Sequence, residues 1–163
     1  MKGEIEVKIN AIRDEDFTNY KKASMFISFP TCTFKCEKEC GIKCCQNSEL
    51  AKSPITDYDI DKLIKRYVDN IYTSAIVCGG LEPFDSFEEL IIFIMKFREI
   101  SKDDIVIYTG YNEYEIQNKI DKLKQYENII VKFGRFIPNK EKHFDEVLGI
   151  YLASDNQYAK KIS

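Results

Sequence analysis

Residues 74–83 read Ser-Ala-Ile-Val-Cys-Gly-Gly-Leu-Glu-Pro, a short apolar run that ends in two glycines. Such a run is typical of a buried strand, and paired glycines allow the backbone to turn sharply and to approach a neighbour closely. An amphipathic stretch, residues 86–100, follows at once and places Leu90, Ile94 and Phe97 on one face. The sequence therefore predicts a strand, a glycine turn and a helix in succession.

The same alternation extends along the rest of the chain. Residues 57–70 and 112–126 are also amphipathic, and Ser86 with Glu89 fits a capping box at the start of the middle helix. Strands that alternate with helices predict a mostly parallel sheet joined by right-handed crossovers. We expect an α/β fold in one domain, residues 1–163, built as a partial (βα) barrel or an open sheet. The predicted strands are 4–11, 25–29, 75–78, 105–108, 129–133 and 147–152.

Three chemically distinctive segments follow three of these strands. Phe29 leads into a cysteine-rich segment, Cys78 leads into Gly79, and Tyr108 leads into Thr109-Gly110-Tyr111. In parallel α/β folds the functional groups gather at the carboxyl ends of the strands. The sequence thus predicts that the three segments meet at one edge of the sheet.

Cysteine clustering is the strongest single signal in the sequence. Five of the six cysteines lie within 14 residues, and Cys78 stands apart. A disulfide framework spreads its cysteines across the fold, whereas a metal site gathers them. Thiolates are soft ligands that suit iron–sulfur clusters or zinc. The clustered cysteines are Cys32, Cys36, Cys40, Cys44 and Cys45.

The composition indicates which kinds of partner and which cellular compartment to expect. A net charge of −3 argues against a surface built to neutralise phosphates, so we expect no nucleic-acid partner. The apolar runs are too short to cross a bilayer, and residues 1–13 lack the apolar centre of a signal peptide. We expect a cytoplasmic protein that has no contact with membranes.

Four motifs, in order, resemble the radical S-adenosylmethionine family, and within it the small activating enzymes of glycyl radical enzymes. Cys32 and Cys36 have the family's first spacing, and the residues after Cys45 look like those that follow the family's third cysteine. Residues 79–83 are similar to its Gly-Gly-Glu-Pro segment. Residues 108–111 and the ending at 148–157 are also similar to segments of these activating enzymes.

The resemblance implies two cofactors. A 4Fe-4S cluster would be held by Cys32, Cys36 and Cys45, and the iron without a protein ligand would chelate S-adenosylmethionine (SAM). An electron from the cluster would then cleave SAM into methionine and a 5′-deoxyadenosyl radical. The resemblance also implies the residues that contact SAM, which are Gly79, Gly80, Glu82, Thr109 and Asn156.

Three cysteines are candidates for the third cluster ligand. The gap after Cys36 is eight residues where the family has two, a widening that costs only about 1.2 kcal/mol of closure entropy. Cys45 is favoured by the residues after it, followed by Cys44 and then Cys40. Cys36, Cys40 and Cys44 also recur every four residues and could bind a separate zinc.

Three alternative functions are compatible with this sequence. The first is an enzyme that installs a glycyl radical in a large partner, with anaerobic ribonucleoside-triphosphate reductase as the favoured partner and flavodoxin or ferredoxin as electron donor. The second is a radical SAM enzyme that acts on a small molecule or a peptide. The third is a non-catalytic zinc or iron–sulfur module.

Overall fold

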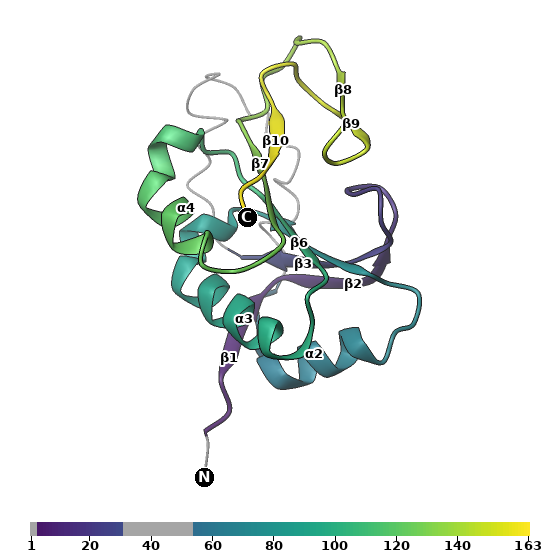
Figure 1. The fold of residues 1–163 in the computed structure, drawn as a ribbon, viewed down its shortest axis with the longest axis vertical. Coiled ribbons are helices and arrows are strands. Elements are labelled where there is room, and N and C mark those ends of the chain that lie inside the picture. Colours follow the sequence, from purple (N-terminus) through teal and green to yellow (C-terminus); the bar gives the residue numbers. More distant parts are fainter. Residues whose placement is uncertain (1–2, 31–53) are drawn as a thin grey trace.

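Four apolar strands form the centre of a six-stranded sheet in the computed structural model, which describes residues 3–30 and 54–163. They lie parallel, and each pairs with the next one along the chain. Both faces of these strands are largely buried, which accounts for their continuous apolar sequences. The prediction of a mostly parallel α/β sheet is confirmed (Figure 1). The four strands are β3 (Ser24–Phe29), β5 (Ala75–Gly80), β6 (Asp104–Tyr108) and β7 (Ile129–Phe133).

An antiparallel strand lies at each edge of this sheet. β2 (Ala11–Asp16) pairs with β3, and β10 (Tyr158–Lys161) pairs with β7, so the order is β10-β7-β6-β5-β3-β2. Neither strand was predicted from the sequence, because both are largely exposed and rich in charged residues. Charged residues on edge strands hinder pairing with other chains. The sheet is therefore open and mixed rather than wholly parallel.

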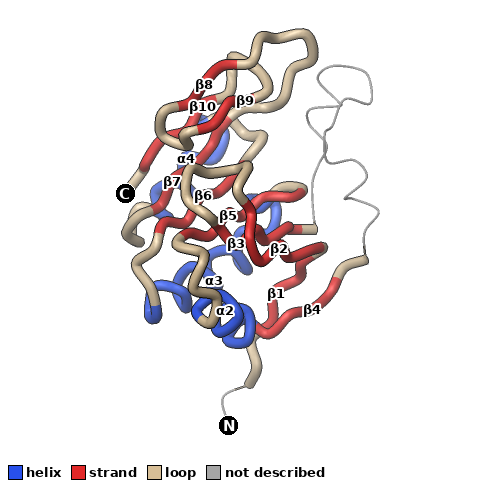
Figure 2. The backbone as a smooth tube through the Cα atoms, turned by 90° about the vertical axis from the view of Figure 1, so that its right-hand side faces the viewer, coloured by secondary structure: helices blue, strands red, loops and turns tan. Residues whose placement is uncertain are grey.

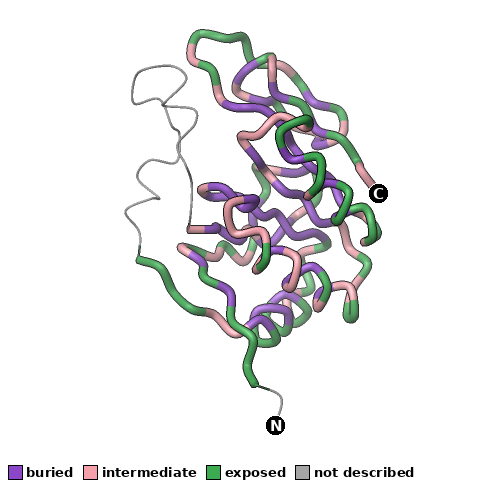
Figure 3. The backbone as a smooth tube through the Cα atoms, turned by 90° about the vertical axis from the view of Figure 1, so that its left-hand side faces the viewer, coloured by how far each residue is buried: buried purple, intermediate pink, exposed green. Residues whose placement is uncertain are grey.

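Three helices in the described residues cover one face of the sheet (Figure 1). They are α2 (Ile60–Val68), α3 (Phe87–Ile100) and α4 (Gln117–Leu123). Right-handed crossovers between strands that advance in one direction place every connecting helix on the same side. Leu63 and Phe93 are among the helix residues that pack into the main core with the strands. Buried and exposed stretches alternate along the helical turns in Figure 3, as expected for helices that pack one face against the sheet.

The opposite face of the sheet has a smaller apolar cluster. Its strand residues include Val77 and Val106, and they are covered by Tyr20, Leu148 and Leu152 from segments outside the helical layer. This cover lies over part of the face only. Toward the carboxyl ends of the strands, the same face borders a cavity.

Two predicted boundaries near the amino terminus were wrong. Residues 4–11 do not form one strand: β1 (Glu6–Ile9) pairs with β4 (Thr56–Asp59) outside the main sheet, and Ala11 begins β2. Residues 57–59 belong to β4 and not to the first helix. Asp59 accepts a hydrogen bond from the Lys62 amide at 2.8 Å, so it caps the helix, which begins at Ile60.

Further corrections concern the ends of other elements. Residues 147–152 contain only the strand β9 (Ile150–Leu152), which pairs with β8 (His143–Asp145). Short 3₁₀ helices, η2 (Pro83–Ser86) and η3 (Glu113–Ile116), precede α3 and α4. Figure 2 shows the β8–β9 and β1–β4 pairs toward opposite ends of the molecule.

The predicted capping box at the start of α3 was also wrong. Ser86 makes no side-chain capping hydrogen bond there, and the Glu89 carboxylate accepts the Lys8 amide at 3.0 Å instead. A capping box forms between Asn112 and Glu115, at the start of η3. The tertiary contact of Glu89 with β1 therefore takes the place of the capping box that the local sequence pattern predicts.

Candidate functional site

One cavity of about 730 Å³ lies at the carboxyl ends of the parallel strands. It is lined by Gly79 and Gly80 at the end of β5, by residues 81–82 directly after β5, by residues 109–110 after β6, and by Gly134 after β7. The last residues of β3 also border it and lead through Pro30 into the cysteine-rich segment. The prediction that functional segments meet at one edge is confirmed for the loops after β5 and β6.

The two glycines let β5 end in close contact with β3. Gly80 has φ +83°, and a Cβ atom there would lie 2.0 Å from Ser28 Oγ and 2.8 Å from Ser28 Cα. A Cβ on Gly79 would lie 2.9 Å from Phe26 Cζ. The Leu81 amide then donates to the Phe29 carbonyl at 3.1 Å, which extends the pairing by one residue. Glycine is thus required at this edge by both conformation and space.

Glu82 is buried, with 5% of its surface exposed, and both carboxylate oxygens accept backbone hydrogen bonds. Oε1 accepts the Phe84 amide at 3.1 Å, and Oε2 accepts the Gly110 amide at 2.8 Å. Burial raises the pKa of Glu82 to about 7, against the lowering effect of these amides and of the Thr109 hydroxyl. The side chain therefore joins the loop after β5 to the loop after β6.

Thr109 is buried beside this contact. Its amide donates to the Lys132 carbonyl at 2.9 Å, and its hydroxyl oxygen accepts the Tyr111 amide at 3.0 Å. The hydroxyl also lowers the pKa of Glu82. Thr109 consequently shapes the turn at the end of β6, a role that short polar side chains often have in turns.

Asn156 belongs to a second wall, where the end of β7 meets the segment before β10. Its Nδ2 donates to the Arg135 carbonyl at 2.8 Å, and its buried Oδ1 has no hydrogen-bond partner among the described residues. The neighbouring Gln157 lines the cavity, and its Nε2 donates to the Gly134 carbonyl at 3.3 Å. Gly134, with φ +101°, leaves space for this approach.

Two buried polar residues of the cavity, Lys132 and Ser28, were not predicted from the sequence. Lys132 is only 7% exposed; its Nζ donates to the Gly134 carbonyl at 3.0 Å and lies 5.7 Å from the centre of the Tyr108 ring. Ser28 is buried at the end of β3, and its hydroxyl has no partner among the described residues. A lysine within the apolar run 129–133 was a usable signal, because lysine is rarely buried without a specific partner.

A family of 4Fe-4S single cluster domains matches residues 21–157 of the chain. The chain belongs to this family. The 4Fe-4S single cluster domain is typical of radical SAM activases, so the predicted iron–sulfur chemistry is confirmed at that level. No curated protein matches the chain.

The structure brings together four of the residues expected to contact SAM in this 4Fe-4S single cluster domain. Gly79, Gly80, Glu82 and Thr109 line one cavity, and Asn156 adjoins it through Gln157. Their contact with a cofactor stays a prediction. The expected cluster ligands Cys32, Cys36 and Cys45, with the alternatives Cys40 and Cys44, lie outside the described residues.

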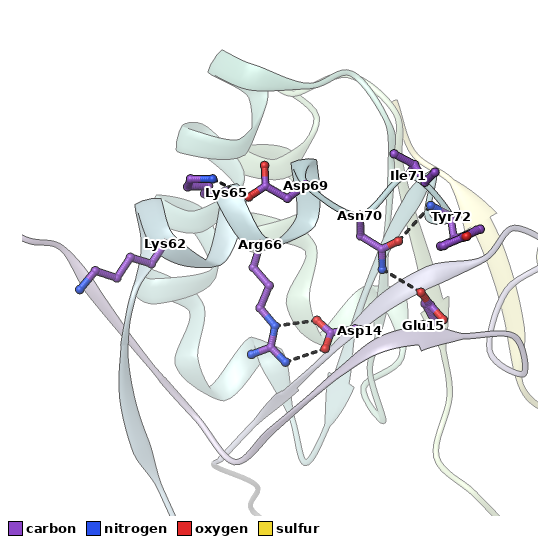
Figure 4. A pocket seen from close by; sticks show the side chains of 9 residues that line it. All are labelled: Asp14, Glu15, Lys62, Lys65, Arg66, Asp69, Asn70, Ile71 and Tyr72. Carbon is purple, nitrogen blue, oxygen red and sulfur yellow. Dashed lines mark hydrogen bonds and ion pairs between the residues drawn. The ribbon is translucent and has the colours of Figure 1, made fainter.

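A second hollow, of about 720 Å³, lies at the other end of the sheet, between α2 and β2 (Figure 4). Several of its charged groups pair with one another: Lys65 with Asp69, and Arg66 with Asp14 through Nε at 2.6 Å and Nη2 at 2.7 Å. Asn70 Nδ2 donates to Glu15 Oε1 at 3.1 Å. Since these exposed groups bond to each other, we assign this hollow no ligand.

None of the helices in the described part of the chain is both long enough and apolar enough to cross a bilayer.

Proposed function

We propose that this protein is a radical SAM activating enzyme that generates a glycyl radical on a partner, with anaerobic ribonucleoside-triphosphate reductase as the favoured partner. The observation that carries the proposal is the convergence of the loops after β5, β6 and β7 on one cavity, at the edge where β3 leads into the cysteines. Membership in the 4Fe-4S single cluster domain family supports the cluster.

The described residues fit a ligand with the chemistry of SAM. Gly79 and Gly80 leave the strand end open to close backbone approach, which suits the amino-acid end of SAM. The ammonium group of Lys132 offers a positive charge to a carboxylate. The unpartnered oxygens of Ser28 and Asn156 can bond to polar groups of a ligand, which would relieve the cost of leaving them unpaired.

When bound, the 4Fe-4S cluster supplies the electron that cleaves the sulfonium of SAM. Cys32, Cys36 and Cys45 would hold the cluster, directly after the strand that borders the cavity. The chain's own residues would bind and orient SAM. Glu82 and Thr109 are buried and form one wall of the cavity.

A protein substrate is supported by the way the cavity reaches the surface. Tyr151 lines the cavity and is 70% exposed, so the rim is open to a segment of another molecule. Exposed tyrosines are frequent in protein–protein contacts. A glycine-bearing loop of a partner could therefore approach from this side.

The proposal is tested with anaerobically reconstituted protein, dithionite, SAM and the candidate reductase. We expect release of 5′-deoxyadenosine and an electron paramagnetic resonance doublet from a glycyl radical on the reductase. Release of 5′-deoxyadenosine with no doublet on any glycyl radical enzyme would favour a small-molecule or peptide substrate. A colourless protein that binds one zinc tightly would refute the proposal in favour of a structural metal module.

Cysteine variants test the ligand assignment, and the chain provides a matched control. Cys32→Ala, Cys36→Ala and Cys45→Ala should each abolish iron binding and the brown colour. Cys78→Ala should keep both, because Cys78 is buried in the main core and is not one of the five clustered cysteines of the sequence. A Cys45→Ala protein that retains the cluster would move the third ligand to Cys44 or Cys40.

A further inference from the structure

The Glu82 side chain connects two walls of the cavity that are far apart in sequence. Oε2 accepts the amide of Gly110, 28 residues away, at 2.8 Å, while Oε1 accepts the amide of Phe84 at 3.1 Å. Glu82 thus caps η2 and holds the end of β6 with the same carboxylate. Both oxygens are engaged by protein amides.

We propose that Glu82 is a positioning residue, whose carboxylate sets the distance between the Gly79–Gly80 turn and the Thr109–Gly110 turn and thereby the shape of the cavity. The inference rests on the proposed function, because it assigns the cavity to SAM. It differs from the expectation that Glu82 contacts SAM directly. In this role Glu82 acts through the two turns.

The surroundings explain why a carboxylate is suited to this role. A buried carboxylate accepts hydrogen bonds at both oxygens, whereas a Gln amide would turn an NH₂ group toward one of the two backbone amides. The hydroxyl of Thr109 also favours the charged carboxylate, since it lowers the pKa of Glu82. A glutamine at this position would therefore leave one amide unpaired in a buried place, which is costly.

The charged and titratable groups around Glu82 come from η2, α4, β7 and the loop after β6. The negative charge of Asp85 in η2 raises the pKa of Glu82. The Asp85 carboxylate accepts a hydrogen bond from the Tyr111 hydroxyl at 2.6 Å. Lys119 of α4 donates to the Phe84 carbonyl at 2.9 Å, and Lys132 of β7 lines the same cavity. Because burial raises the pKa of Glu82 to about 7, its carboxylate gains and loses a proton near neutral pH.

The first test uses the protein without any ligand. In a nitrogen–proton correlation spectrum, we expect the Gly110 amide signal to shift between about pH 5 and about pH 9, as Glu82 loses its proton. The shift should vanish in Glu82→Gln and persist in Glu88→Gln, which makes the same chemical change on the exposed surface of α3. A Gly110 signal that does not titrate, or that titrates equally in Glu82→Gln, would overturn the proposal. If Glu82→Gln does not fold, the wild-type titration decides.

The second test measures SAM affinity of the reconstituted protein by equilibrium dialysis across the same pH range. Glu82→Gln should bind SAM about tenfold more weakly at pH 8, the loss expected for one charge-assisted hydrogen bond. The difference between the two proteins should grow as pH rises through 7, which a purely structural defect would not produce. Equal affinities and equal pH profiles would overturn the proposal. If the wild-type protein binds no SAM, the proposed function is refuted. The Gly110 titration would still test whether Glu82 connects the two turns.

Discussion

The two hollows of this protein have nearly the same volume, about 730 Å³ at the carboxyl ends of the strands and about 720 Å³ at the other end. They use polar groups in opposite ways. Around Arg66 and Asp14, charged side chains are exposed and pair with each other (Figure 4). Around Glu82 and Lys132, polar side chains are buried and hold the backbone of neighbouring loops.

This difference shows where the fold carries a cost in folding free energy. Burying a carboxylate or an ammonium group is costly, and two hydroxyl or amide oxygens near the carboxyl-end cavity have no partner among the described residues. Exposed ion pairs cost little and contribute little. If the cavity is the functional site, substitutions there should have large effects, and substitutions at the second hollow should have small ones.

The largest effect is expected from Gly80→Ala. Its φ of +83° disfavours alanine, and the new Cβ would lie 2.0 Å from Ser28 Oγ. Together, the backbone strain and the clash should lower the free energy of unfolding by roughly 4 kcal/mol. Urea denaturation measures the change. Gly3→Ala is the matched control, because a Cβ there meets nothing within 4 Å; equal effects of the two substitutions would refute the required close approach.

The requirement for this glycine was visible in the sequence, but the reason for it was not. Two glycines after an apolar run indicated a turn with close backbone approach. That the neighbour is Ser28 follows from the parallel pairing of β3 with β5, in the register that sets Ser28 opposite Gly79. Register depends on the packing of the whole sheet, so a local pattern does not provide it.

The next largest effect concerns the pH dependence of stability. The pKa of Glu82 is raised from its ordinary value of 4.5 to about 7 in the folded protein, so the folded state holds a proton that the unfolded state releases. The contribution of Glu82 to stability should therefore fall as pH rises from about 4.5 to about 7, by roughly 3 kcal/mol, and then level off. Unfolding free energies of wild type and Glu82→Gln, compared across this range, isolate the contribution. A difference that is constant with pH would contradict the raised pKa.

The link made by Glu82 also marks the limit of sequence reasoning. The pattern 79–83 indicated a functional loop, but the partner of Glu82 is an amide 28 residues away. The central strands were predictable because their buried apolar runs are continuous. The edge strands β2 and β10 were not, because charged and exposed residues give no clear period.

A smaller effect is expected from Asn156→Ala. The substitution removes the 2.8 Å hydrogen bond to the Arg135 carbonyl, which should cost about 1 kcal/mol of folding free energy. It also removes the buried Oδ1 that has no partner among the described residues, which offsets part of this loss of folding free energy. If Oδ1 bonds to SAM, the loss of SAM affinity should exceed the loss of stability. Thermal unfolding with and without SAM compares the two, and a SAM-induced stabilisation equal to that of wild type would exclude Asn156 from the binding site.

The smallest effect is expected at the second hollow, where Arg66 and Asp14 form a bidentate pair. Both side chains are more than a third exposed, at 39% and 46%, so solvent screens the pair. A double-mutant cycle with Arg66→Ala and Asp14→Ala should give a coupling below about 1 kcal/mol, and less at high salt. SAM affinity should not change in any of the three variants, since the pair lies at the opposite end of the strands from the cavity. A tenfold loss of SAM affinity in Arg66→Ala would mean that the two hollows are coupled and that the distinction drawn between them is wrong.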